Sequence, residues 1–131
     1  MSFSDDIRRF ATKTTEAHDK IARVATLELF SGVIKATPVD TGRARGNWQT
    51  AAGSPATGET DRLDKSGAEA VSEVEAKTPA GAGQVTYLSN NLPYIADLEN
   101  GTSTQAPEGM VKRNMDRVQK MVDAAIQKNK V

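Results

Sequence analysis

The sequence is poor in several residue types, and each scarcity excludes a class of protein. It contains no cysteine, which excludes disulfide bonds and thiolate-bound metals. Aromatic residues make up 5% and apolar residues 37% of the chain, so the core is small and contact between subunits would add stability. The 17 basic residues are balanced by 17 acidic ones, without the basic excess of a duplex-DNA binder.

Long hydrophobic runs are missing as well. No apolar stretch approaches the length of a membrane span, and the first residues lack the basic-then-apolar pattern of a signal peptide. We therefore expect a soluble intracellular protein that binds no membrane.

A length of 131 residues predicts one domain, 1–131. Apolar residues at helical spacing predict a helix over residues 5–35, about 45 Å long, whereas a globule of this size is roughly 36 Å across. The first half of this helix is expected to reach outward onto a neighbouring subunit. Its candidate interface residues are Phe3, Ile7 and Phe10.

The rest of the chain alternates short elements and loops. In chain order we expect a turn and tryptophan strand over 37–51, a flexible loop over 52–64, a short helix over 65–78, a strand over 84–89, a short helix over 92–100 and a C-terminal helix over 107–128. Trp48, Tyr87 and Tyr94 are the expected core or strand residues. The pattern predicts an α+β fold with a small antiparallel or mixed sheet, two short helices and long helices at both ends.

The triplet Asp40-Thr41-Gly42 has two interpretations. It matches the active-site triplet of an aspartic protease, which needs the aspartate at the end of a buried strand, where two carboxylates share a proton. Here it follows a helix and precedes Arg43, so we favour a turn in which Asp40 binds backbone amides or Arg43 and Gly42 takes a positive φ. Gly101 is expected to end the short helix before it in the same way. We expect no enzymatic activity, cofactor or metal.

Two arginines near the only tryptophan also have two interpretations. Arg43 and Arg45 would suit phosphate contacts, with Trp48 stacking on bases. Alternatively, Arg43 pairs with Asp40 or Glu99, and Trp48 fills the core against the long helix. We favour the core for Trp48 and keep both interpretations open for the arginines. Arg43, Arg45 and Glu99 are thus candidate interface or channel residues.

Two segments resemble a known family. Residues 37–48 read TPVDTGRARGNW and residues 85–103 read VTYLSNNLPYIADLENGTS. They resemble the signature blocks of the small neck and tail-completion (minor tail) proteins of long-tailed bacteriophages. The likeness continues through residues 105–111, QAPEGMV. It departs at Ala44, where leucine is common, and at Ile95, which shifts the usual alanine by one position.

The resemblance implies a structural virion protein that is not an enzyme. Such proteins are expected to form rings, typically sixfold, at the head-tail junction around the DNA channel. The implied partners are further copies of the chain, the tail terminator and tail tube, the head-side connector or stopper, and DNA that passes without sequence-specific binding. Assembly would take place in the host cytoplasm. The alternative is a small adaptor that contacts nucleic acid or a host protein through Arg43, Arg45 and Trp48.

Overall fold

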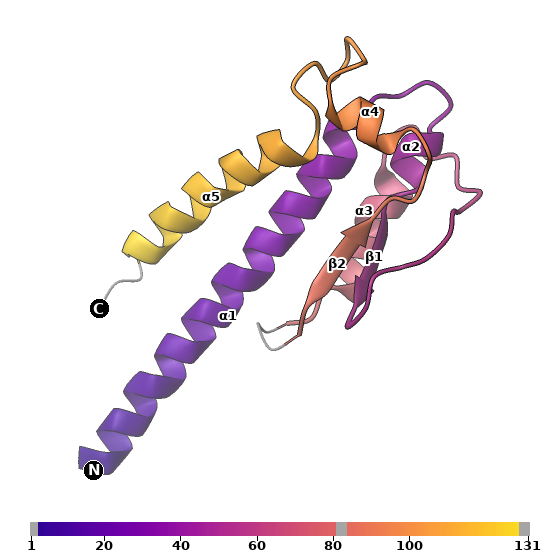
Figure 1. The fold of residues 1–131 in the computed structure, drawn as a ribbon. Helices are drawn as coiled ribbons and strands as arrows, with labels where there is room; N and C mark the ends of the chain where they lie inside the picture. The colour runs from indigo at the N-terminus through magenta and orange to yellow at the C-terminus, as the bar shows by residue number, and fades with distance from the viewer. Residues whose placement is uncertain (1–2, 81–83, 129–131) are drawn as a thin grey trace.

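The computed structural model describes residues 3–80 and 84–128, and for residues 3–16 it describes the backbone alone. In chain order the elements are α1 (Phe3–Ala36), α2 (Arg43–Gly46), β1 (Gln49–Ala52), α3 (Ala68–Lys77), β2 (Thr86–Ser89), α4 (Ile95–Glu99) and α5 (Val111–Lys128). The expected α+β class is confirmed, with a two-stranded antiparallel sheet (Figure 1). In these ranges no helix has both the length and the apolar character that crossing a membrane requires.

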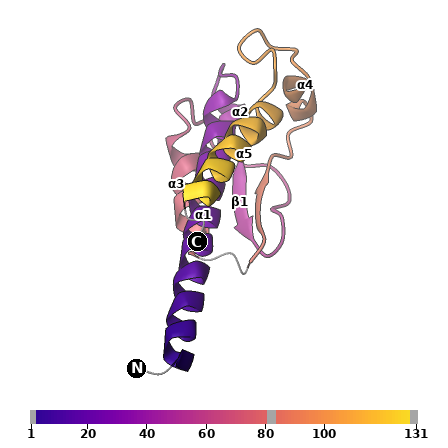
Figure 2. The ribbon, with the colours of Figure 1, turned by 90° about the vertical axis from the view of Figure 1, so that its left-hand side faces the viewer.

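Helix α1 dominates the shape of the molecule. It contains 34 residues, which corresponds to about 51 Å at the usual helical rise. Figures 1 and 2 show its N-terminal turns extending beyond every other element. Phe3, Ile7 and Phe10 lie on these turns, but their side chains lie outside the described part of the chain. Their contact with a neighbouring subunit stays a prediction.

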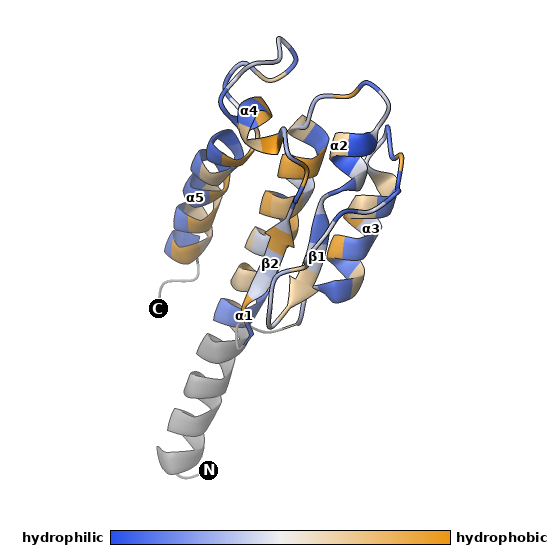
Figure 3. Ribbon diagram, turned by 45° about the vertical axis from the view of Figure 1, so that its right-hand side comes forward, coloured by the Kyte–Doolittle hydropathy of each residue, from blue (hydrophilic) through white to orange (hydrophobic). Residues whose placement is uncertain are grey.

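The core surrounds the C-terminal half of α1, where apolar residues gather along the helix (Figure 3). Helix α1 packs against both α3 and α5, and α3 also packs against β1. The buried apolar cluster consists of Phe30, Val33, Ile34, Trp48, Ala70, Val74, Ala106 and Met110. The elements therefore form layers, with α5 on one side of α1 and α3 with the sheet on the other (Figure 1).

The sheet is shorter than the sequence suggests. Its register pairs Gln49 with Ser89 and Ala51 with Tyr87, and the Tyr87 side chain is half-buried. Trp48 was expected within the first strand but lies one residue before it. The reason is helix α2, one turn that the sequence analysis missed, which occupies the residues directly before Asn47.

Three other helices begin later than expected. The C-terminal helix starts at Val111 rather than at residue 107, because the chain first turns through Gly109, whose φ is 79°. The short helix expected over 92–100 is α4, which has only five residues. The helix expected over 65–78 corresponds to α3, which begins after Gly67, where φ is 80°.

The segment expected as a flexible loop, 52–64, contains no helix or strand after β1 ends, yet its second half is held by hydrogen bonds. The Asn47 side chain binds both backbone groups of Thr60: its Oδ1 accepts from the amide (2.8 Å) and its Nδ2 donates to the carbonyl (3.2 Å). The Arg62 guanidinium pairs with the Glu73 carboxylate of α3 at 3.1 Å. These bonds fold the loop back onto α2 and α3.

Candidate functional site

The candidate site is the elbow, defined as residues 37–48, which connects α1 to β1. Thr37 is fully buried where α1 ends, and its hydroxyl donates to the Val33 carbonyl at 2.7 Å. The same oxygen accepts from the Trp48 indole Nε1 at 2.8 Å. Pro38 follows directly, and a proline disfavours helical geometry in the residue before it. The structure therefore places Trp48, which is 6% exposed, in the core.

The protease-like triplet, Asp40-Thr41-Gly42, forms a tight turn. Gly42 has a φ of 89°, and its carbonyl accepts from the amides of Gly46 (2.9 Å) and Asp64 (3.0 Å). The Thr41 hydroxyl, rather than Asp40, accepts from a backbone amide of this turn. Asp40 is exposed and has no hydrogen-bond or ion-pair partner in the described part of the chain. The expected capping role of Asp40 is therefore wrong.

Arg45 has a structural role. Its guanidinium donates to three backbone carbonyls, those of Thr37 (2.9 Å), Lys65 (2.7 Å) and Lys35 (2.8 Å). Two of these carbonyls lie at the C-terminal end of α1. Carbonyl groups at this end of a helix have no amide partner within the helix, and a positive charge is favourable there. Arg45 thus caps α1 and ties the loop before α3 to it.

Arg43 points to the surface. Its Nη2 lies 2.7 Å from the Glu59 carboxylate, with both side chains about half exposed. Its partner is therefore Glu59 and neither Asp40 nor Glu99, the two partners considered from the sequence. An exposed pair of this kind contributes little to stability.

Glu99, a candidate interface residue, instead caps α5. Its Oε1 accepts from the amides of Met110 and Val111, both at 2.8 Å, and its Oε2 accepts from Lys112 at 3.1 Å. Burial raises the pKa of this carboxyl, but the three backbone hydrogen bonds outweigh it and hold the pKa below 4.5. The turn between Glu99 and α5 passes through Gly101, whose φ is 85°.

Side chains join the elbow to the second family-like segment and to residues 105–111, which continue it. The Val39 amide donates to Gln105 Oε1 at 2.9 Å, and Gln105 Nε2 donates back to the Val39 carbonyl at 3.2 Å. The Asn90 side chain donates to the Ala44 carbonyl at 2.9 Å. Neither role is predictable from the sequence, because an amide side chain carries no local signal for a partner 46 or 66 residues away.

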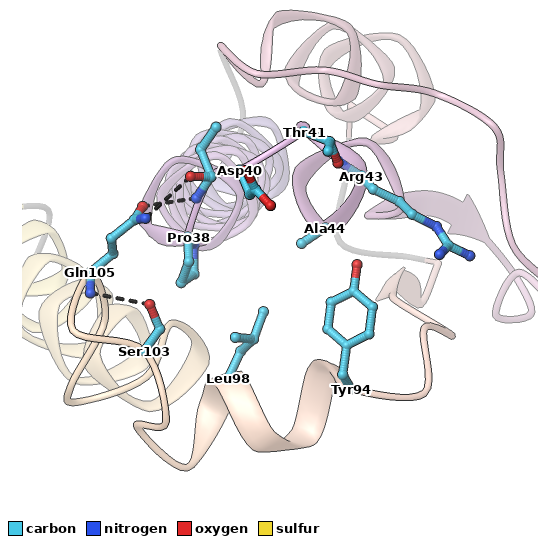
Figure 4. Close-up of a pocket in the computed structure, with 10 residues that line it drawn as sticks. Pro38, Asp40, Thr41, Arg43, Ala44, Tyr94, Leu98, Ser103 and Gln105 are labelled. Carbon is cyan, nitrogen blue, oxygen red and sulfur yellow. Dashed lines mark hydrogen bonds between the residues drawn. The ribbon is translucent and has the colours of Figure 1, made fainter.

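An open cavity of about 300 Å³ lies where the two segments meet. Figure 4 shows Tyr94 and Leu98 facing Ala44 across it, with Asp40 and Arg43 at its margin. Tyr94 was expected in the core, but its side chain is 37% exposed and lines this cavity instead.

The cavity offers an apolar floor with a phenol, a carboxylate and a guanidinium around it, which suits contact with a polar side chain. Among the described residues no group of three or more His, Cys, Asp or Glu side chains could hold a metal ion. Comparison of the chain with protein-family profiles, curated proteins and solved structures finds no match. The functional inference therefore depends on the residues and geometry of this chain.

Proposed function

We propose that this protein is a structural virion component, a tail-completion or neck subunit that forms a ring at the head-tail junction. It joins the tail terminator and tube to the head-side connector or stopper around the DNA channel, after assembly in the host cytoplasm. The proposal is carried by one observation. Residues 37–48 and 85–103, which together resemble that family, lie in contact with each other in the structure. Segments far apart in sequence thus form one unit.

An apolar groove on the surface supports assembly from several copies. Helix α5 diverges from α1 toward its C-terminal end (Figure 1), and an apolar groove of about 240 Å³ lies between the two helices. Its lining includes Ile21 and Val24 of α1 and Met121 and Val122 of α5. Val24 is 43% exposed in the single chain. Exposed apolar surface of this kind marks interaction sites, and a contact between two different patches closes into a ring when its rotation divides a full turn.

The projecting turns of α1 from a second copy are the occupant that we propose for this groove. Val24→Asp would place a charge in the groove and is expected to abolish self-association, measured as mass by light scattering over a range of concentrations. Leu63→Asp is the matched control, because Leu63 is 66% exposed and does not line the groove. Equal self-association of both variants would contradict the groove as the subunit contact.

The location in the virion needs a separate test. An antibody against this protein is expected to label purified virions at the head-tail junction, as seen by electron microscopy. Label confined to another part of the particle, or particles without label, would refute the proposed function.

The adaptor alternative is less favoured, since Trp48 is buried and Arg45 is bonded to backbone carbonyls. Of its three residues, only Arg43 is exposed.

A further inference from the structure

A second cavity, of about 520 Å³, lies between the C-terminal end of α1 and the N-terminal end of α5. Four of its ten lining residues are basic, namely Lys35, Arg45, Arg113 and Arg117, and none is acidic. We call this the basic cavity. In a chain with no net charge, such a local excess of positive charge favours an anionic ligand.

Two of the four cations have no partner among the described residues. The side chains of Lys35 and Arg113 are exposed and make no hydrogen bond or ion pair with any described residue. Arg45 uses its donors on backbone carbonyls. Arg117 donates to the Glu28 backbone carbonyl at 3.0 Å and pairs with the Glu28 carboxylate at 3.3 Å; both side chains are about half exposed, so the ion pair is weak and can rearrange. The cavity therefore keeps unused positive charge.

One wall of the basic cavity is built by close packing of α1 and α5. Asn114 is 6% exposed; its Nδ2 donates to the Met110 carbonyl at 2.7 Å, and its Oδ1 accepts from Arg117 Nε at 3.3 Å. The absence of a side chain at Gly32 permits this approach, because a Cβ there would lie 2.6 Å from Arg117 Nη2. The Arg117 guanidinium is thus held at the wall by packing and by a buried amide.

We propose that the basic cavity binds a phosphate group, through Lys35, Arg113 and Arg117. Guanidinium groups donate paired N–H groups that match phosphate oxygens, and a phosphate can accept from several sides at once. The phosphate is either a free anion or part of a DNA backbone. This inference goes beyond the ring assembly, and it places phosphate contact at the junction of α1 and α5 instead of at Arg43 and Trp48.

The test measures binding of inorganic phosphate by calorimetry and of a short duplex DNA by fluorescence anisotropy, at one fixed ionic strength. Arg113→Gln and Lys35→Gln are each expected to weaken binding about tenfold, because each removes a charge-assisted hydrogen bond. Lys112→Gln is the control: it removes the same charge one residue from Arg113, on an exposed side chain that does not line the cavity. Its affinity should stay within about twofold of the unmodified chain.

Binding of either probe that falls in the two cavity variants and not in the control supports the site, and the probe that binds identifies the source of the phosphate. Three results would overturn it: neither probe binds, all three variants lose the same affinity, or a polyglutamate peptide competes as well as phosphate does. Circular dichroism of each variant checks folding, which should be unchanged because the replaced side chains are exposed. The oligomeric state is measured separately, so this proposal can fail while the ring assembly holds.

Discussion

The carboxylate of Glu99 connects the second family-like segment to α5, and its removal tests that connection. The carboxylate accepts hydrogen bonds from three consecutive amides, those of Met110, Val111 and Lys112. These amides precede or begin α5, where backbone N–H groups have no partner within the helix. Glu99→Gln keeps one oxygen that can accept two of the bonds, but it loses the negative charge and the third bond. Glu99→Ala loses all three.

The expected magnitudes follow from these losses. The favourable interaction of a negative charge with a helix N-terminus is worth about 0.3–1 kcal/mol, and the hydrogen bonds of a capping side chain about 0.5–2 kcal/mol. We therefore expect Glu99→Gln, which loses the charge and keeps part of the cap, to lower the free energy of unfolding by about 1 kcal/mol, and Glu99→Ala, which loses both, by about 1–3 kcal/mol. For a domain of this size, 1 kcal/mol lowers the midpoint of thermal unfolding by about 4 °C.

The effect of Glu99 depends on pH with a defined sign. Burial raises the pKa of its carboxyl, but the three amides outweigh burial and hold the folded-state pKa below 4.5. The stabilisation is therefore complete above about pH 4.5 and is lost as the pH falls through the folded-state pKa. The difference in stability between the unmodified chain and Glu99→Gln should be largest near neutral pH and should narrow on acidification.

Urea unfolding monitored by circular dichroism, at pH 7 and at a series of lower pH values, measures this difference. Glu108→Gln is the control, because Glu108 is exposed in the same segment and has no partner among the described residues. The control should match the unmodified chain at every pH. Equal stability of Glu99→Gln and the unmodified chain at pH 7, or a difference that stays constant with pH, would refute the capping role.

Two further predictions concern the elbow. Gly42 and Gly53 have the same φ of 89°, but a Cβ on Gly42 would lie 2.6 Å from the Lys65 amide nitrogen, whereas nothing lies within 4 Å at Gly53. Gly53→Ala should lower the free energy of unfolding by about 1 kcal/mol through backbone strain, and Gly42→Ala should lower it by at least about 2 kcal/mol more, as measured by urea unfolding. Equal losses in the two variants would contradict the clash. Trp48→Phe removes the indole donor to Thr37 and should lower the free energy of unfolding by about 1–2 kcal/mol, measured by urea unfolding followed by circular dichroism. An unchanged unfolding midpoint would contradict a stabilising role of this hydrogen bond.

The sequence indicates the longer elements and misses the short ones for a physical reason. Apolar spacing places α1 within two residues of its observed ends, because periodicity over many turns leaves a clear signal. The same spacing indicates α3 and α5, and the alternation of residue types indicates β2. Helix α2 has four residues, RARG, with no apolar period, so only its hydrogen bonds reveal it.

Side-chain roles at the candidate site were harder to predict than elements. The turn glycines Gly42 and Gly101 follow from local chemistry, because a positive φ is a property of the residue itself. The partners of Arg45 and Glu99 lie elsewhere in the chain and are selected by packing that no local pattern encodes. A charged residue in a family-like motif suggests a binding role, yet here both cap the end of a helix.

This distinction bears on how variants of the family-like segments should be interpreted. Thr37, Arg45 and Glu99 use their polar groups inside the molecule, so their replacement weakens the fold and any subunit contact together. Loss of assembly in such a variant therefore cannot identify a contact surface. Val24 and Arg113 lie outside both segments, and one lines the apolar groove while the other lines the basic cavity. Because neither supports the elbow, variants at these two positions separate the choice of partner from the stability of the fold.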